Sequence, residues 1–305
     1  MTQTVQDKAL EANMGEDHAW GGAALQAQDV VLKRGRATTI LQGVDLTVPA
    51  GAVLGLVGRN GAGKTSLMQC LVGLSVPQEG RCRLLGEDAL ELSDAVKSRL
   101  GYVSQQPDLF DWLSADGHFR RFQDAYPNWD SNRAMALAAR LGLPLYTVAR
   151  SLSGGDQQKL SVVLALAHDP DLLILDEPVS SLDPITRRDF MRSLFERRWS
   201  TQGPRTILIS SHLLSDLERV VSHVVFMRKG RIQLMDEWDA LTEHLRLLEL
   251  PAGHSALPAQ AVHRRRFGEM ERVVFDTRVA DAPPAAGRAL TLDELFLELN
   301  DEASA

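Results

Sequence analysis

Cysteine is scarce in this 305-residue sequence, and the two that occur are Cys70 and Cys82. Two isolated cysteines make neither a disulfide framework nor a metal-binding motif. We therefore expect both to be buried or reduced thiols, as is usual in a reducing compartment.

Positive charge is also in short supply. The 33 Lys and Arg residues stand against 40 Asp and Glu, which gives a formal net charge of −7. A chain with this balance offers no electrostatic footprint for DNA or RNA, so we expect no nucleic-acid partner.

Long apolar runs are absent as well. None approaches the roughly 20 residues that a bilayer span needs, and the N-terminus lacks the basic-then-apolar pattern of a secretory signal. The composition, with 44% hydrophobic and 24% charged residues, is that of a soluble globular protein. We expect a cytoplasmic protein without a membrane span of its own, which would reach a membrane only through a partner.

The pattern along the chain predicts three regions. Residues 1–23 are polar and aperiodic, which favours a mobile tail. Residues 24–241 carry apolar strands that alternate with helices, a pattern typical of an α/β fold with a parallel sheet. Residues 242–305 read as strands and a final helix, a small C-terminal α+β appendage.

Within the α/β region, three subdivisions are expected. Residues 25–57 alternate short β-rich stretches with turns, and the fold is expected to include an antiparallel β subdomain. Residues 107–168 are mostly helical in pattern and predict a helical subdomain, in which Ala134, Met135, Ala138 and Leu141 share one face. The stretch 223–234 predicts a hairpin with its turn at Lys229 and Gly230.

A glycine-rich loop, "GRNGAGKT", follows the apolar strand "AVLGLV" and precedes a helix. Its glycines allow backbone N–H groups to curl around phosphate oxygens, and the helix N-terminus adds partial positive charge. Lys64 would bring a full charge to the β and γ oxygens, and Thr65 a hydroxyl to Mg²⁺. The loop predicts a phosphate cradle of these residues: Gly58, Arg59, Asn60, Gly61, Ala62, Gly63, Lys64, Thr65 and Ser66.

Two acids end a second apolar strand, "LLILDEP". Ligands gather at the carboxyl ends of strands in open parallel sheets, so Asp176 is placed to hold Mg²⁺. Glu177 is placed to act as the general base toward the attacking water. The alternative is that both acids merely cap the next helix.

Two further polar residues follow strands. His212 comes after "ILISS" and is a candidate sensor of the γ-phosphate, with a purely structural histidine as the alternative. Gln105 comes after "GYVS", and its amide is a candidate ligand for the metal or for water.

A second small turn, "LSGGDQQ", stands at a predicted helix start. Ser153 supplies a hydroxyl there, and Gly154 and Gly155 expose backbone amides, which together favour an anion. One nucleotide needs only one cradle, so the purpose of this second turn is open at this point.

The motifs together resemble those of the ATP-binding subunits of ABC transporters, over residues 25–238. "GRNGAGKT" resembles the Walker A motif, "LLILDE" the Walker B motif and "LSGGDQQ" the ABC signature. "SSLD", which ends at Asp183, resembles the D-loop, Gln105 the Q-loop glutamine and His212 the switch histidine. The resemblance implies a P-loop ATPase fold and an enzyme that hydrolyses ATP with Mg²⁺.

The resemblance also gives the second turn a purpose. In this family two ATPase subunits pack head to tail, and each ATP lies between the cradle of one and the signature of the other. Ser153, Gly154, Gly155 and Asp156 would then bind the γ-phosphate held by a second, identical or different, ATPase subunit. The family usually stacks an aromatic ring on adenine, and none stands near Arg34. Either Arg34 stacks on the base or selectivity for the base is weak. Ser181 replaces the usual glycine or alanine of the D-loop.

The closing "LTLDELFLEL" and the stretch "YPNWD" resemble ATPases of bacterial ABC-2-type exporters. This resemblance implies an integral membrane permease as partner, export as the direction of transport, and a peripheral place on the cytoplasmic face of the membrane. The rival is a soluble ABC ATPase that acts on ribosomes or nucleic acid. That class usually has two ATPase domains or long coiled-coil insertions, and neither is visible here.

Two surface features allow two interpretations each. Phe110 and Trp112 would line a groove for a cytoplasmic helix of the permease, or they are ordinary core aromatics of the helical subdomain. The basic run "HRRRF" would contact anionic lipid or nucleic acid, or it is the solvated face of a strand, which we favour.

Overall fold

A computed structural model describes residues 22–35, 38–180, 182–195, 205–211, 217–252, 261–279 and 287–300. The predicted tail lies outside the described residues except for its last two positions. There the first strand, β1, already begins at Ala23.

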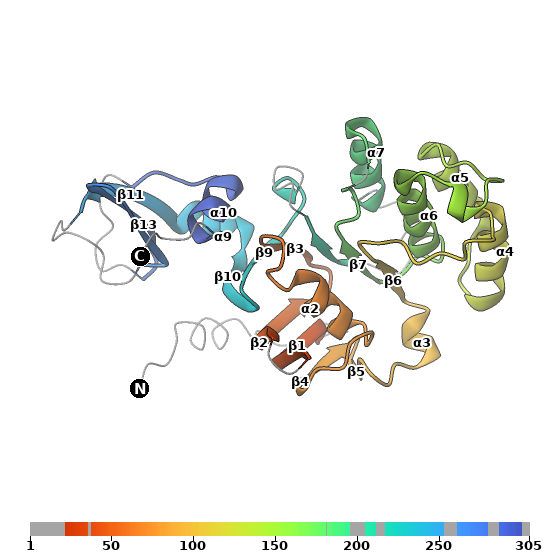
Figure 1. The fold of residues 1–305 in the computed structure, drawn as a ribbon, viewed down its shortest axis with the longest axis horizontal. Coiled ribbons are helices and arrows are strands. Elements are labelled where there is room, and N and C mark those ends of the chain that lie inside the picture. Colours follow the sequence, from red (N-terminus) through yellow and green to blue (C-terminus); the bar gives the residue numbers. More distant parts are fainter. Residues whose placement is uncertain are drawn as a thin grey trace.

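A six-stranded sheet forms the centre of the molecule (Figure 1). Its order is β10-β9-β3-β8-β7-β6; β9 and β10 pair antiparallel and the other pairs are parallel. Every residue of β7 and β8 is buried, because their continuous apolar runs are covered on both faces. The predicted parallel sheet is confirmed. Its strands are β3 (Val53–Val57), β6 (Leu100–Val103), β7 (Leu172–Asp176), β8 (Thr206–Ser210), β9 (His223–Arg228) and β10 (Arg231–Glu237).

The predicted hairpin is confirmed as β9 and β10. Lys229 and Gly230 form its turn, with φ angles of 48° and 76°. Both residues of a type I′ hairpin turn need positive φ, and glycine adopts it without strain.

A second, antiparallel sheet has the order β2-β1-β4-β5. The helix α2 (Lys64–Leu71) contacts strands of both sheets, and its apolar side chains join them in one core cluster. Cys70 and Cys82 lie in that cluster as free thiols, and burial raises their pKa to about 11 and about 12. The strands are β1 (Ala23–Arg34), β2 (Thr38–Pro49), β4 (Glu79–Leu84) and β5 (Glu87–Asp88).

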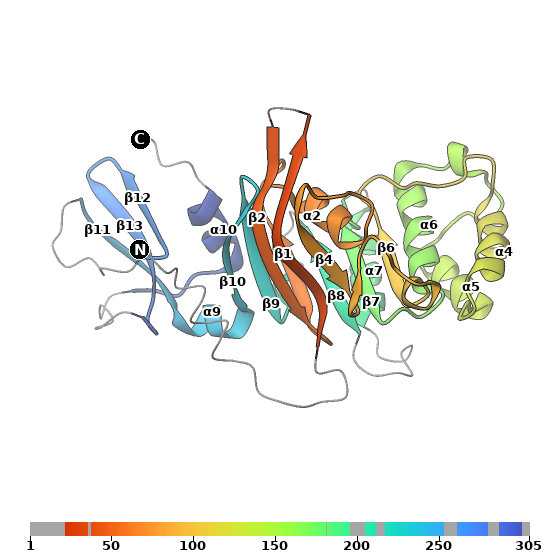
Figure 2. The same cartoon turned by 90° about the horizontal axis from the view of Figure 1, so that it is seen from below.

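The predicted helical stretch lies at one end of the molecule (Figures 1 and 2). Side chains cap its three helices at their N-termini: Ser114 accepts from Gly117 N, Asp130 from Arg133 N and Ser153 from Asp156 N. The elements before, within and after this stretch are α3 (Asp94–Lys97), α4 (Ala115–Ala125), α5 (Ser131–Arg140), the 3₁₀ turn η1 (Ala149–Ser151), α6 (Gly154–Leu166) and α7 (Pro184–Phe195).

One detail of α5 differs from expectation. Ala134, Ala138 and Leu141 are buried as predicted, but Met135 is 45% exposed and Leu137 is buried instead. Leu137 lies three residues from Ala134 and four from Leu141, whereas Met135 is rotated by about 100° from Ala134, onto the edge of that face.

The far end is a C-terminal lobe, the name used below for β11 (Leu245–Pro251), β12 (His263–Phe267), β13 (Met270–Asp276) and α10 (Leu292–Asn300). Its sheet has the order β11-β13-β12, and α9 (Trp238–His244) leads into it from β10. Several buried apolar residues of the lobe, among them Leu247, Val274 and Leu295, belong to the same core cluster as those of the helical end. Within the part of the chain that the structure describes, no helix is both long and apolar enough to cross a bilayer.

The basic run lies on β12, an edge strand of the lobe. Arg264 and Arg266 are exposed on one side of the strand, as period-two alternation requires. This placement agrees with the interpretation as a solvated face.

Candidate functional site

The glycine-rich loop connects the end of β3 to the start of α2 and is held in a tight curl. Gly61 and Gly63 have φ angles of 82° and 105°, which side chains rarely permit. A Cβ at Gly58 would lie only 2.5 Å from the carbonyl oxygen of Met227 on β9. The glycine spacing seen in the sequence therefore has a steric reason at each of these positions.

Lys64 folds back over this loop. Its Nζ donates to the carbonyl oxygen of Gly58 at 2.8 Å and lies 3.7 Å from Oε1 of Glu177. The Lys64 side chain is 7% exposed and that of Glu177 6%, so this is a buried ion pair. The structure thus brings the cation of the loop and the second acid of the strand motif to one point.

The other loop residues surround Lys64. Arg59 and Asn60 are exposed at the outer part of the loop, and Ala62 is buried. Thr65 and Ser66 follow in the first turn of α2, both half-buried. Their backbone N–H groups belong to the helix N-terminus, where an anion is favoured.

Asp176 and Glu177 share one hydroxyl on the neighbouring strand. Ser210 Oγ donates to Asp176 Oδ1 at 2.6 Å and accepts from the backbone N–H of Glu177 at 2.9 Å. Glu177 has a φ of 49°, a left-handed conformation that turns the chain sharply after β7. Ser210 therefore holds the carboxylate of Asp176 and the backbone of Glu177.

The second oxygen of Asp176 fits a metal ion. Asp176 is fully buried, and its Oδ2 has no hydrogen-bond partner. A buried carboxylate oxygen without a partner is costly unless a cation or water satisfies it. Among the described residues no three His, Cys, Asp or Glu side chains form a metal site by themselves. Mg²⁺ at Asp176 would thus take its other ligands from hydroxyl, water and phosphate oxygens, which is its habit in nucleotide sites.

The signature turn begins α6. Ser153 Oγ accepts from Asp156 N at 3.1 Å and donates to Asp156 Oδ2 at 2.7 Å, while Lys159 Nζ lies 2.9 Å from Asp156 Oδ1. Burial would raise the pKa of Asp156, but the hydrogen bonds from Ser153 and Lys159 outweigh it and the pKa is lowered. Ser153 and Gly154 are exposed, and Gly155 is half-buried.

The phosphate loop and the signature turn lie on different parts of the structure. The helix α6 contacts β6, α4 and α5, whereas α2 contacts β1, β2, β4 and β7. Figure 1 shows the two helices apart, with α6 in the helical end. The signature turn is thus presented outward by a separate part of the molecule.

The remaining predicted residues are exposed or lie outside the described residues. Gln105 follows β6 and is exposed, as is Arg34 at the end of β1. Asp183 caps α7, where its Oδ1 accepts from Thr186 N and Ile185 N. A hydrogen bond from the Thr186 side chain, together with these backbone bonds, lowers the pKa of Asp183. His212 and Ser181 lie outside the described residues.

Sequence reasoning missed two contributors to this site. One is Ser210, whose signal was a hydroxyl at the end of the strand that neighbours β7. The other is the turn of the β9–β10 hairpin, where the backbone N–H of Gly230 donates to the carbonyl oxygen of Ala62 at 2.9 Å. The hairpin was visible in the sequence, but its contact with the loop depends on strand order, which the sequence does not state.

Comparison with known proteins agrees with these motifs. The family model described as ABC transporter matches residues 41–180. The nickel import ATP-binding protein NikO of Rhodobacter capsulatus is 32% identical over 206 residues, which cover 63% of this chain and 81% of that protein. The bacitracin transport ATP-binding protein BcrA of Enterococcus faecalis is 32% identical over 198 residues, 64% of this chain and 63% of that protein.

A much longer relative also matches nearly the whole chain. The ATP-binding cassette sub-family A member 7 of Mus musculus is 30% identical over 306 residues, which cover 96% of this chain but 14% of that protein. The chain therefore spans less than two thirds of this relative and of BcrA.

Solved structures share the fold. An ATP-binding subunit of an ABC transporter superposes with a TM-score of 0.65 at 26% identity, over 72% of this chain and 92% of that one. The MJ0796 cassette, in a dimeric post-hydrolysis state with ADP and Pi, superposes with a TM-score of 0.61 at 21% identity, over 70% and 98% of the two chains. With the curled phosphate loop, the strand-end acids and the capped signature turn in place, this chain belongs to the family of ABC transporter ATP-binding proteins.

Proposed function

We propose that this chain binds and hydrolyses ATP as the ATP-binding subunit of an ABC transporter and drives export through a separate membrane permease. The proposal rests on two observations: the buried ion pair of Lys64 and Glu177, and the neighbouring Asp176 Oδ2, which has no hydrogen-bond partner. Phosphoryl transfer needs a cation that binds phosphate, a carboxylate that activates water and a ligand for Mg²⁺. Lys64, Glu177 and Asp176 would supply these three groups at one edge of the sheet.

The loop of residues 58–66 binds the phosphates. Its backbone N–H groups and the α2 N-terminus face the anion, and Lys64 adds a full positive charge to the β and γ oxygens. Thr65 and Asp176 hold Mg²⁺, and Gln105 adds its amide to the metal or to a water. Mg²⁺ held by these residues would supply positive charge to the phosphates.

Glu177 is the general base toward the attacking water. Ser210 holds its backbone, and Lys64 lies beside its carboxylate and compensates its charge. His212 contacts the γ-phosphate in this proposal.

A second ATPase subunit completes the site. Ser153, Gly154, Gly155 and Asp156 face the γ-phosphate that the partner holds, and Asp183 lies at the same interface. Two observations support this arrangement: Ser153 is exposed, and its helix α6 packs on elements other than those that contact α2, except that both helices contact the central sheet. The dimeric state named for the MJ0796 cassette, which has the same fold, also supports it.

The permease would dock at the exposed aromatic pair of the helical end. Phe110 is 43% and Trp112 69% exposed, and their ring centroids lie 5.4 Å apart. Such exposure favours the docking interpretation over ordinary core aromatics. The relatives include proteins named for import and for export, so export rests on the motif resemblance. The chain would then sit on the cytoplasmic face of the membrane, and Arg34 would contact adenine.

Purification from detergent-solubilised membranes tests the proposal. We expect a multispanning protein to co-purify with the chain and the complex to hydrolyse ATP in the presence of Mg²⁺. Co-purification with ribosomes or nucleic acid instead would favour the rival class of soluble ABC ATPases. Absence of any ATP turnover would overturn the enzymatic assignment.

A further inference from the structure

The turn of the β9–β10 hairpin is wedged between the phosphate loop and β2. Gly230 donates its N–H to Ala62 O and accepts, through its carbonyl oxygen, from Gln42 N, both at 2.9 Å. A Cβ on Gly230 would lie 2.1 Å from Ile40 O, so the turn packs closely against β2 and has no room for a side chain there. The hydrogen bond to Ala62 links the position of the hairpin to that of the phosphate loop.

The hairpin supports the loop at a second place. Gly58 approaches Met227 O on β9 so closely that even a methyl group would clash. The first glycine of the loop and Ala62, near its other end, thus both rest on residues 227–230 of the hairpin.

The C-terminal lobe also contacts this hairpin. Arg228, next to the turn, donates from Nη1 to the carbonyl oxygen of Leu299 at 3.3 Å, in the last turn of α10. A cation is favoured at this end of a helix, where the carbonyl groups lack helical partners.

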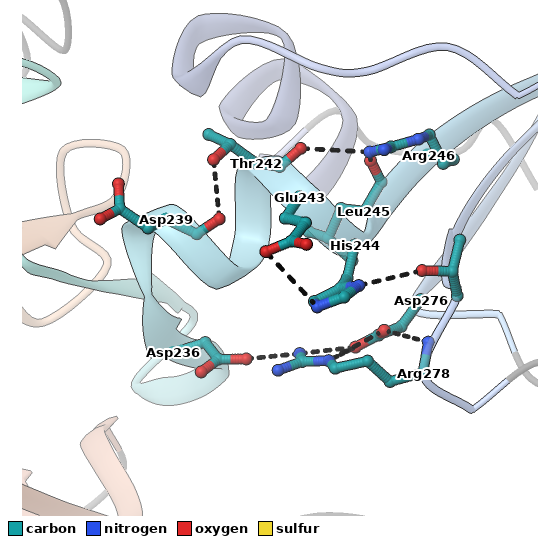
Figure 3. Close-up of polar contacts among 10 residues, drawn as sticks. Asp236, Asp239, Thr242, Glu243, His244, Leu245, Arg246, Asp276 and Arg278 are labelled. Atoms are coloured by element: carbon teal, nitrogen blue, oxygen red, sulfur yellow. Dashed lines mark hydrogen bonds and ion pairs between the residues drawn. The ribbon is translucent and has the colours of Figure 1, made fainter.

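The lobe makes a second contact with the hairpin farther along β10. Figure 3 shows Arg278, just after β13, between Asp276 of the lobe and Asp236 of β10. Arg278 Nη2 lies 2.7 Å from Asp276 Oδ2. Nearby, the backbone N–H of Thr277 donates to His244 O at 3.0 Å, which closes the joint between α9 and the lobe.

β10 is the edge strand of the central sheet, with β9 as its one neighbour there. An edge strand is the part of a sheet that moves most easily, because only one side is hydrogen-bonded. Here the lobe contacts β9 at Arg228 and the edge strand itself at Asp236.

We propose that the C-terminal lobe is a brace for the phosphate loop, and that Arg228 and Arg278 are positioning residues which set its affinity for ATP through the β9–β10 hairpin. This proposal rests on the proposed ATP site. It assigns a role to the lobe without requiring the lobe to contact the nucleotide.

The test compares ATP affinity and turnover in full-length variants. Asp236→Asn weakens the second contact but leaves Arg278 paired with Asp276, and Arg228→Ala removes the contact with α10. We expect each to raise the dissociation constant of a fluorescent ATP analogue and the KM by about twofold to thirtyfold, the range for coupling through a packed network. The kcat should change less than the KM, and Arg228→Lys should recover part of the affinity.

Arg288→Ala is the matched control. It removes an ion pair with Glu294 that lies wholly within the lobe, so it should leave affinity unchanged. Equal losses in Arg288→Ala and Asp236→Asn would overturn the brace, as would wild-type affinity in both Asp236→Asn and Arg228→Ala. If Arg228→Ala does not fold, Asp236→Asn alone decides. A wild-type protein that binds no ATP would instead refute the proposed function.

Discussion

Lys64 and Glu177 form a buried ion pair in which Nζ lies 3.7 Å from Oε1, although Lys64 begins α2 and Glu177 follows β7. The pairing means that each charge holds the other in place at the position where phosphate and water would meet. Substitution of either residue therefore has consequences for the other.

Glu177→Gln keeps the shape of the side chain and removes its basicity. We expect ATP binding to persist and the hydrolysis rate to fall by about 10²- to 10⁴-fold, the usual contribution of a general base. Single-turnover kinetics with purified protein measure the rate. A normal rate would refute Glu177 as the base.

Lys64→Ala removes the charge that faces the phosphates and leaves Glu177 buried without its cation. We expect ATP affinity to fall at least about tenfold, since hydrogen bonds to charged groups contribute roughly 1.5–3 kcal/mol. Equilibrium titration with a fluorescent nucleotide measures this. Lys97→Ala, which removes an exposed pair with Asp94, is the control and should bind ATP as the wild type does.

Ser210→Ala tests the hydroxyl that joins the two acids. Without it, Asp176 Oδ1 and the N–H of Glu177 both lose a partner in a buried place. We expect kcat to fall more than ATP affinity, because phosphate binding by the loop does not involve Ser210. An unchanged kcat would show that the acids keep their directions without this bond.

Trp112→Ala tests the docking surface. Because Trp112 is 69% exposed, its loss should leave folding and basal ATP hydrolysis intact while assembly with the permease fails. Co-purification from membranes is the measurement. Tyr146→Ala removes another exposed aromatic ring of the helical end, 81% exposed, and should not affect assembly. Loss of soluble expression on Trp112→Ala would favour the interpretation as a core aromatic.

Much of the architecture could be predicted because buried parallel strands leave continuous apolar runs. β7 and β8 were visible in this way, and the β9–β10 hairpin was visible from its turn at Lys229 and Gly230. The error at Met135 shows the limit of this reasoning. Helical periodicity predicts which face is buried, but the burial of a residue at the edge of that face depends on what packs against it. The glycines and acids of the site were visible because their chemistry demands those residue types.

The supports of the site were not visible from the sequence. Ser210 and Gly230 act through neighbours that strand order places beside them, and strand order depends on long-range packing. The roles assigned to the site residues stay predictions, those of Lys64, Asp176 and Glu177 included, and so do the boundaries at residues 23 and 241. His212, which lies outside the described residues, also stays a prediction.

The buried His118 of α4 is expected to make the stability of the protein depend on pH. Its side chain is 1% exposed, its Nδ1 lies 2.8 Å from Ser114 O, and its Nε2 accepts from the backbone N–H of Phe110 at 3.0 Å. The ring must be neutral, with its proton on Nδ1, because a second proton would face the N–H of Phe110. Burial lowers the pKa of His118, and the hydrogen bond with Ser114 only partly opposes this; no charged group contributes.

The sign of the effect follows from linkage. A histidine whose pKa is lower in the folded state binds its proton more readily when unfolded. Its contribution to stability is complete above the unfolded value of about 6.5 and is lost as the pH falls below it. His118→Gln retains an acceptor but does not titrate, so denaturant unfolding between pH 5 and about 7.5 should show a weaker loss of stability at acid pH than in the wild type. Equal losses in both proteins would mean that the bond with Phe110 does not depend on the neutral ring.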